Sequence, residues 1–199
     1  AGITAELLTK AGLNVVIVEE GQLKSRTDFK QKEPEAYASL YQENAGRKTK
    51  DKGITILQGR SVGGTTTVNW TSSFHTPPDT LKFWQDKFGL KDYTTETLAP
   101  YFQQAQTRLN ISPWATSPNE NNELLRRGAA KLGIKAEVIP RNVKGCYNLG
   151  SCGMGCPTNA KQSMLVTTIP AALDKGATLL VQTRAEKLAL ASGKVQALR

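Results

Sequence analysis

The sequence predicts an α/β fold, and three observations support this prediction. Residues 4–12 have the pattern of a helix that ends at Gly12. Residues 15–18 follow as a continuous β-branched run, Val-Val-Ile-Val, of the kind that is buried on both faces in a parallel sheet. Near the C-terminus, residues 163–175 and 178–182 repeat the order of helix and strand.

Length and composition exclude several classes of protein. The chain has 199 residues, of which 39% are hydrophobic and 22% are charged, so we expect a globular protein. No run approaches the roughly 20 apolar residues that span a bilayer, and we expect no transmembrane segment. The net charge of +9 suits an anionic ligand. Because aromatic and basic residues do not alternate in the way that favours base stacking, we expect no nucleic-acid partner.

The first residues indicate a fragment of a longer chain, because Ala1 replaces an initiator Met and no helix start signal precedes residue 4. In dinucleotide-binding folds, a carboxylate about 20 residues after the glycine-rich turn binds a ribose. Glu19 ends the first strand at that distance, and Ala1 would hold the last position of the G-x-G-x-x-G/A pattern. A terminal Glu also occurs in α/β proteins that bind nothing there, so both interpretations stand.

The segments between the two helix–strand pairs are more polar. Residues 21–52 are charge-rich, with a helix predicted over residues 33–44, and residues 54–58 form a short apolar run that predicts a strand. Residues 95–110 and 121–132 carry apolar residues at helical spacing, so we predict two amphipathic helices whose apolar faces belong to the core.

The last residues predict a hairpin. Residues 185–190 and 195–198 alternate apolar and polar side chains around Ser192 and Gly193, which is typical of two antiparallel strands joined by a tight turn.

A glycine-rich segment, residues 59–70, follows the predicted strand at 54–58. It contains three glycines and four hydroxyl residues. Glycines allow the backbone to approach an anion closely, and N–H groups at a helix start can face a phosphate. An ordinary glycine-rich turn has the same composition, so the composition alone leaves both uses open.

Three cysteines, Cys146, Cys152 and Cys156, lie close together in the sequence. They include no C-x2-C pair and no fourth ligand for zinc. A proline follows Cys156, as it follows the last ligand of a bacterial ferredoxin run, and three thiolates suit a [3Fe-4S] cluster. The alternative is a glycine-rich loop with buried thiols or one disulfide.

Two motifs resemble those of the glucose-methanol-choline (GMC) family of flavin oxidoreductases. The first signature of that family is similar to Gly59-Arg60-x-x-Gly63-Gly64-Thr65-Thr66-x-x-Asn69. Residues 145–163, here called the cysteine-rich loop, are similar to a segment of the bacterial branch. The resemblance covers residues 1–199 and implies the N-terminal part of a longer enzyme, with an FAD-binding Rossmann-like fold and a β-meander.

The resemblance also implies a division into domains. Residues 1–75 would belong to the FAD-binding domain, without its first turn, and residues 76–145 to a helical, substrate-facing region. Residues 146–199 would contain the cysteine-rich loop and return to the FAD-binding domain.

The resemblance implies a site for non-covalent FAD. The residues expected to hold the cofactor are Glu19, Arg60, Gly63, Gly64, Thr65, Asn69 and Ala185. Glu19 would bind the ribose of the ADP half, and Asn69 would lie near the isoalloxazine ring. Val68 stands where some members carry a histidine that bonds covalently to the flavin, and Val cannot form that bond.

The implied activity is oxidation of an alcohol to an aldehyde or ketone by hydride transfer to the flavin. The family's catalytic His and its His or Asn partner lie near the C-terminus of the enzyme, so no catalytic residue is expected in this chain, and the chain alone is expected to be inactive. His75, in a Thr-Pro-Pro loop, is expected to be structural.

The implied partners are an alcohol and an electron acceptor, which could be oxygen, a quinone or a cytochrome. Some dehydrogenases of the branch hold a [3Fe-4S] cluster with similar cysteine spacing and pass electrons to a haem subunit. An iron–sulfur flavoprotein of that type is the alternative function, and a basic nucleic-acid-binding module is a more remote alternative.

Overall fold

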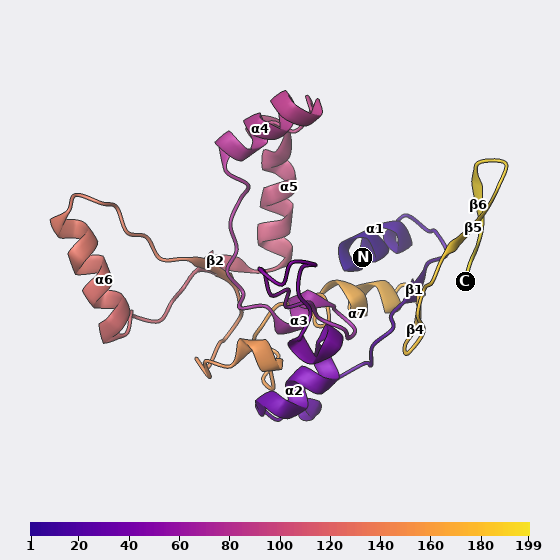
Figure 1. Ribbon diagram of the computed structural model, residues 1–199, viewed down its shortest axis with the longest axis horizontal. Coiled ribbons are helices and arrows are strands. Elements are labelled where there is room, and N and C mark those ends of the chain that lie inside the picture. Colours follow the sequence, from indigo (N-terminus) through magenta and orange to yellow (C-terminus); the bar gives the residue numbers. More distant parts are fainter. The chain divides into compact units, whose positions relative to one another are not determined.

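The computed structural model describes residues 1–199 (Figure 1). By their contacts, these residues form two compact units. The first unit contains residues 1–70 and 144–199, and the second contains residues 71–143. The division into an FAD-binding domain and a substrate-facing region, with boundaries after residues 75 and 145, stays a prediction.

The first unit is built on a parallel pair of strands beside two packed helices. These elements are α1 (Gly2–Lys10), β1 (Val16–Val18), α7 (Thr168–Leu173) and β4 (Thr178–Leu180). The strands β1 and β4 pair in parallel, and α1 packs against α7. A Cβ atom at Gly2 would lie 2.5 Å from Thr168 Oγ1, so this close helix contact needs a glycine. The predicted order of helix and strand is confirmed at both ends of the chain.

The predicted burial of β1 on both faces is wrong. Val16 is 55% exposed, and Ile17 and Val18 are only partly buried. The strand has a single hydrogen-bonded neighbour, β4, and this two-stranded sheet covers little of its surface. The helix predicted over residues 163–175 is also shorter, because Pro170 has no N–H and is tolerated only in the first turn of a helix.

The helix predicted over residues 33–44 is broken into α2 (Glu33–Leu40) and a 3-10 helix, η2 (Gln42–Ala45). Tyr41 separates them with an extended backbone, at φ −118° and ψ 148°. The break places the Tyr41 ring in the main hydrophobic cluster, which consists of Phe29, Ala36, Leu40, Tyr41 and Val68.

The strand predicted over residues 54–58 is absent. This region forms only isolated bridges, between Lys48 and Thr55 and between Tyr41 and Gly59. Ile54 is 64% exposed, so no layer of the fold covers the apolar run. Two further short elements of this unit are the 3-10 helices η1 (Arg26–Asp28) and η3 (Cys152–Met154).

The second unit contains α4 (Pro78–Phe88), α5 (Thr95–Arg108), β2 (Ile111–Pro113), α6 (Glu120–Lys131) and β3 (Pro140–Asn142). The strands β2 and β3 pair antiparallel. The side chain of Thr94 accepts a hydrogen bond from Thr97 N at 3.2 Å, which caps the start of α5. The two helices predicted in this region are confirmed.

The prediction that the apolar faces of α5 and α6 belong to the core is wrong for α6 and holds only in part for α5, where Leu98, Phe102, Ala105 and Leu109 are partly buried. Tyr101 on α5 is 65% exposed, and Leu124 and Leu125 on α6 are 62% and 73% exposed. Helical spacing shows which residues share a face, but it does not show whether another element covers that face.

The first unit ends in the predicted hairpin, made of β5 (Leu188–Ala191) and β6 (Lys194–Leu198) and drawn in yellow in Figure 1. Ser192 and Gly193 join the strands with φ values of 49° and 74°, as a tight turn with two positive φ angles requires. None of the helices is both long and apolar enough to cross a bilayer.

Candidate cofactor-binding site

Three segments of the first unit meet where β1 and β4 end. Gly21, just after β1, accepts a hydrogen bond through its carbonyl from Gln182 N, just after β4, at 3.0 Å. The carbonyl oxygen of the next residue, Gln22, accepts a hydrogen bond from Val62 N of the glycine-rich segment at 3.0 Å. In open α/β sheets, ligands bind outside the carboxyl ends of the strands, so this junction is the candidate site.

Gly21 allows Arg60 to lie close to the end of β1, and Gly59 allows the glycine-rich segment to fold on itself. A Cβ atom at Gly21 would overlap the carbonyl oxygen of Arg60, so only glycine allows this approach. A Cβ atom at Gly59 would lie 2.5 Å from Gly64 O, so the glycine-rich segment folds closely on itself. The tertiary structure therefore places the predicted residues Glu19, Arg60 and Gly64 in one region.

Glu19 is a partly buried carboxylate whose negative charge is partly balanced by the Gly21 N–H and by Arg60. Burial raises the pKa of Glu19 above its ordinary value of 4.5, and the neighbouring charge of Glu20 raises it further. The backbone N–H of Gly21 donates to Glu19 Oε1 at 2.8 Å, and this bond and the charge of Arg60 oppose the increase in pKa. A carboxylate in this position can accept hydrogen bonds from ribose hydroxyl groups.

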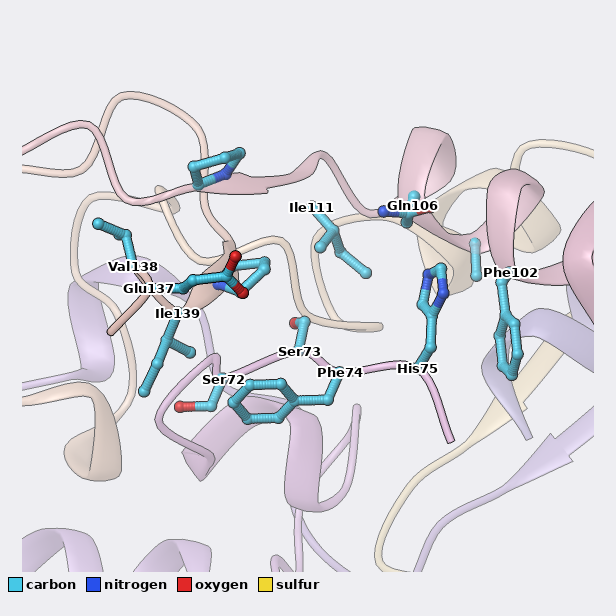
Figure 2. Close-up of a pocket in the computed structure, with 13 residues that line it drawn as sticks. Ser72, Ser73, Phe74, His75, Phe102, Gln106, Ile111, Glu137, Val138 and Ile139 are labelled. Atoms are coloured by element: carbon cyan, nitrogen blue, oxygen red, sulfur yellow. The ribbon is translucent and has the colours of Figure 1, made fainter. Parts of the chain in front are cut away.

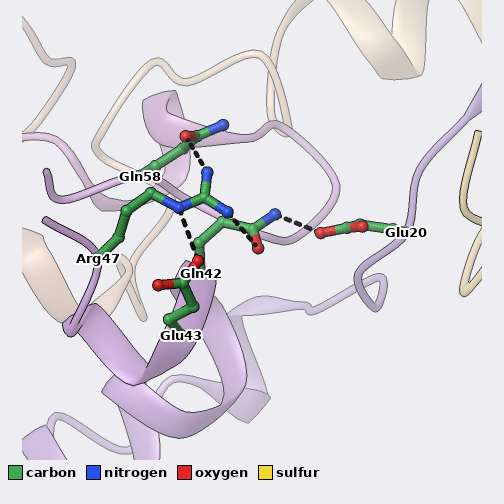
Figure 3. A network of polar contacts seen from close by, with 5 residues as sticks. All are labelled: Glu20, Gln42, Glu43, Arg47 and Gln58. Carbon is green, nitrogen blue, oxygen red and sulfur yellow. Dashed lines mark hydrogen bonds and ion pairs between the residues drawn. The ribbon is translucent and has the colours of Figure 1, made fainter. Parts of the chain in front are cut away.

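Glu20 belongs to a separate polar network (Figure 3). Gln42 Nε2 donates to Glu20 Oε1, and Arg47 Nη2 donates to Gln42 Oε1 at 3.4 Å. Arg47 also donates to Gln58 Oε1 at 2.8 Å and to Glu43 Oε1 at 3.0 Å. The network ties η2 and the loop that follows it to the end of β1, and it engages the carboxylate of Glu20 rather than that of Glu19.

The two adjacent glycines of the segment have different surroundings. Gly63 has φ +91°, and a Cβ atom there would lie 2.5 Å from Thr67 Oγ1 and 3.0 Å from Leu165 Cβ. Gly64 has φ +55° and ψ −143°, a conformation open almost only to glycine, and no atom lies within 4 Å of its Cβ position. The open space beside Gly64 fits a bound cofactor, whereas Gly63 faces protein atoms.

The glycine-rich segment continues into the short helix α3 (Thr65–Val68). Thr65 is exposed and its Oγ1 accepts a hydrogen bond from Gly59 N at 3.1 Å. Thr66 Oγ1 accepts a hydrogen bond from Met164 N at 3.0 Å, which links the helix to the residue that follows the cysteine-rich loop. Val68 is 3% exposed within the hydrophobic cluster, so its side chain has no access to a ligand.

Asn69 and Ala185 lie at the edges of this region. Asn69 ends α3, and its carbonyl oxygen accepts a hydrogen bond from Lys161 Nζ at 2.9 Å. The sequence analysis missed Lys161, since a lysine between Ala160 and Gln162 carries no sign of burial. Ala185 is exposed and lies two residues beyond Thr183, whose N–H donates to Glu19 O at 3.0 Å.

The structure does not support the predicted [3Fe-4S] cluster. Cys146, Cys152 and Cys156 are partly buried, and none of them forms a disulfide. No three side chains of His, Cys, Asp or Glu lie where they could share a metal ion. A three-iron cluster needs its thiolates at one place, and nearness in sequence does not bring these sulfurs together. The alternative, a glycine-rich loop with buried thiols or one disulfide, agrees with this arrangement only in part, because the thiols are partly buried and none forms a disulfide.

Cys156 has the most polar surroundings of the three thiols. Burial acts to raise the pKa of Cys156, but hydrogen bonds from the Thr158 hydroxyl and from the N–H groups of Lys161, Thr158 and Ala160 outweigh it, so the pKa is lowered. The Thr158 Oγ1 and Lys161 N atoms lie 3.4 Å and 3.5 Å from the sulfur.

The second unit contains an open cavity of about 840 Å³ (Figure 2). Its apolar lining includes Phe74, Phe102, Ile111, Val138 and Ile139, and its polar lining includes Ser72, Ser73, His75, Gln106 and Glu137. The rings of His75 and Phe102 stack at 4.5 Å between centroids, with an interplanar angle of 14°. His75 therefore forms part of a cavity wall.

Comparison with known proteins identifies the family. A family model described as GMC oxidoreductase matches residues 37–199. Long-chain-alcohol oxidase FAO1 of Arabidopsis thaliana is 32% identical over 190 residues, which cover 96% of this chain and 25% of that protein. An uncharacterized GMC-type oxidoreductase of Sinorhizobium fredii is 32% identical over 193 residues, covering 96% of this chain and 38% of that protein.

A more distant relative is the cholesterol oxidase of Mycobacterium tuberculosis, 23% identical over 214 residues that cover 91% of this chain and 36% of that protein. The chain thus spans between a quarter and two-fifths of the length of these relatives. With most of its residues matched by the family model, the chain belongs to the GMC oxidoreductases, a family of FAD-binding enzymes.

Proposed function

We propose that the protein containing this chain oxidises an alcohol to an aldehyde or ketone with FAD, and that the first unit holds the cofactor. Family membership supports FAD, and the relatives named long-chain-alcohol oxidase and cholesterol oxidase support an alcohol as the substrate. The observation that carries the proposal is the meeting of Glu19, Arg60 and the open backbone of Gly64 at the ends of β1 and β4.

Each of these residues has a task suited to its chemistry. The carboxylate of Glu19 accepts hydrogen bonds from the ribose hydroxyls, and the positive charge of Arg60 lies beside it. Gly64 leaves the space that a side chain would fill, so the backbone can approach the cofactor. Bound FAD would supply the hydride acceptor for the alcohol carbon.

We propose that FAD is held without a covalent bond. Val68 offers only a hydrocarbon side chain, and that side chain is 3% exposed among Phe29, Leu40 and Tyr41. Neither its chemistry nor its burial permits a bond to a flavin.

The cavity of the second unit is the candidate site for the hydrocarbon part of the alcohol. Its volume of about 840 Å³ falls in the range of small-molecule sites, and its apolar walls suit a long alkyl chain or a ring system. The relatives that are named oxidases favour oxygen over a quinone or a cytochrome as the electron acceptor.

Purification of the full-length protein tests the proposal. We expect a yellow protein with the visible flavin bands, and acid precipitation should release all of the colour into the supernatant. Under anaerobic conditions, at least one member of a panel of short-chain, long-chain and sterol alcohols should bleach the flavin. A colourless protein, or flavin that no alcohol bleaches, contradicts the proposed activity, and colour retained in the pellet contradicts non-covalent binding.

A further inference from the structure

Lys161 is the one charged residue among the buried residues of the chain, at 2% exposure. Burying a charge is costly unless polar groups surround it. Lys161 Nζ donates to Asn69 O at 2.9 Å and to Cys152 O at 2.8 Å. The ammonium group is therefore held at a defined place by two backbone carbonyls.

These two contacts join separate parts of the candidate site. Asn69 ends the helix α3, which follows the open backbone of Gly64, and Cys152 begins η3 in the cysteine-rich loop. Lys161 lies 92 residues beyond Asn69 and nine beyond Cys152, and its own N–H contacts Cys156 Sγ at 3.5 Å. Lys161 thus fixes the end of the glycine-rich segment against the loop.

The role of the positive charge can be separated from the role of the hydrogen bonds. Two carbonyl oxygens can be satisfied by any N–H donor, including the amide of a glutamine. What the ammonium adds is a positive charge in a place shielded from water, where charges interact more strongly than in bulk solvent. That charge lies one hydrogen bond from Asn69.

We propose that Lys161 is a positioning residue of the cofactor site, which holds the Asn69 end of the glycine-rich segment and favours the reduced flavin by its positive charge. This inference rests on the proposed function, in which Asn69 lies near the flavin. Two-electron reduction of a bound flavin with uptake of one proton would add one negative charge to it. The Lys161 ammonium would stabilise that charge and so would raise the reduction potential.

The test compares variants of the full-length flavoprotein. Lys161→Gln keeps N–H donors but removes the charge, and Lys161→Met removes both. Lys175→Gln, an exposed lysine of the first unit, is the matched control. The measurements are the midpoint potential of the bound flavin, the visible circular dichroism of the flavin, the FAD dissociation constant and thermal unfolding.

We expect Lys161→Gln to lower the equilibrium constant for flavin reduction at least tenfold, which is about 30 mV for a two-electron couple. Lys161→Met should also weaken FAD binding at least tenfold and change the flavin circular dichroism, because Asn69 is no longer held. Lys175→Gln should leave all four measurements at their wild-type values.

A wild-type potential in Lys161→Gln, while the wild-type protein binds FAD, overturns this inference and leaves the proposed function intact. A wild-type protein without flavin overturns the proposed function and this inference together. If Lys161→Met fails to fold, Lys161→Arg replaces it, because this variant keeps the charge. Its potential should stay closer to the wild-type value than that of Lys161→Gln, and the reverse order also overturns the inference.

Discussion

The phenol of Tyr41 donates a hydrogen bond to the carbonyl oxygen of Gly153 across 2.7 Å. The two residues are 112 positions apart, and the bond joins the break after α2 to the cysteine-rich loop. Tyr41 is 4% exposed, and a Cβ atom at Gly153 would lie 3.3 Å from its hydroxyl oxygen. The bond helps to hold the loop that also contains Lys161.

Tyr41→Phe should destabilise the fold. The substitution keeps the ring in the hydrophobic cluster but leaves the Gly153 carbonyl without this donor, which costs about 1–3 kcal/mol for a buried acceptor. Chemical denaturation measures the change. Tyr37→Phe is the control, since its hydroxyl makes only an exposed bond to Glu33 at 3.3 Å. Equal effects of the two substitutions would contradict the prediction.

The buried phenol of Tyr41 also predicts how the stability of the fold changes at alkaline pH. Burial raises the pKa of Tyr41 above its ordinary value of 10.0, and the charge of Tyr37 raises it further. A raised pKa in the folded state contributes stability that is fully present below the unfolded value and is lost as the pH rises through the folded value. The wild type should therefore lose more stability than Tyr41→Phe when the pH rises above 10.0.

Glu19→Gln should separate stability from cofactor binding. Because burial raises the pKa of Glu19 from 4.5, its stability contribution is fully present below that pH and is lost as the pH rises through the raised pKa. Near pH 7 the cofactor-free Gln variant should thus be more stable than the wild type, with the difference shrinking toward pH 4.5.

Although Glu19→Gln should stabilise the cofactor-free protein near pH 7, it should weaken FAD binding. Loss of hydrogen bonds between a charged carboxylate and the ribose should weaken FAD affinity by about 1.5–3 kcal/mol. Denaturation across pH and titration with FAD measure the two effects. A stability difference between Glu19→Gln and the wild type that does not vary with pH would refute the first expectation, and unchanged affinity would refute the second.

Substitution of Gly63 and of Gly64 by alanine should lower the free energy of unfolding by different amounts. Gly63→Ala adds overpacking against Thr67 and Leu165 to backbone strain, at about 1–3 kcal/mol for each effect. Gly64→Ala carries only the strain, about 1–3 kcal/mol, but places a methyl group in the open space that fits the cofactor. Unfolding of the cofactor-free protein should show the larger loss for Gly63→Ala.

FAD titration completes this comparison. When both variants are measured under conditions where they are folded, Gly64→Ala should lose more FAD affinity than Gly63→Ala. An equal loss of stability at the two positions, or wild-type FAD affinity in Gly64→Ala, would show that the open space has a different use.

Phe102→Ala in the full-length enzyme should discriminate between alcohols by size. Phe102 lines the apolar cavity, and removal of its ring should lower kcat/KM for a long-chain alcohol by about 1–2 kcal/mol. A short-chain alcohol should be affected much less, because it fills less of the cavity. Phe83→Ala is the control, since Phe83 is 50% exposed on α4 and does not line the cavity. A uniform loss for all alcohols would argue against the cavity as the hydrocarbon site.

Local signals in the sequence were sufficient for several elements. Gly12 ends α1, Ser192 and Gly193 form the turn of the C-terminal hairpin, and the apolar spacing of residues 95–110 predicts α5. These features depend on neighbours within a few positions, so composition and spacing describe them directly. The motif around Gly63 and Gly64 indicates the same family as the matching family model.

Tertiary structure alone decided which residues are buried and which lie together. Spacing could not show that Leu125 is exposed, that Gly63 faces protein atoms while Gly64 faces open space, or that Lys161 is buried. It also left open whether the three neighbouring cysteines converge on a cluster, and no three metal-binding side chains lie together in the structure. Burial and contact depend on segments far apart in the chain, such as Lys161 and Asn69, whereas periodicity describes only the order of residues within one segment.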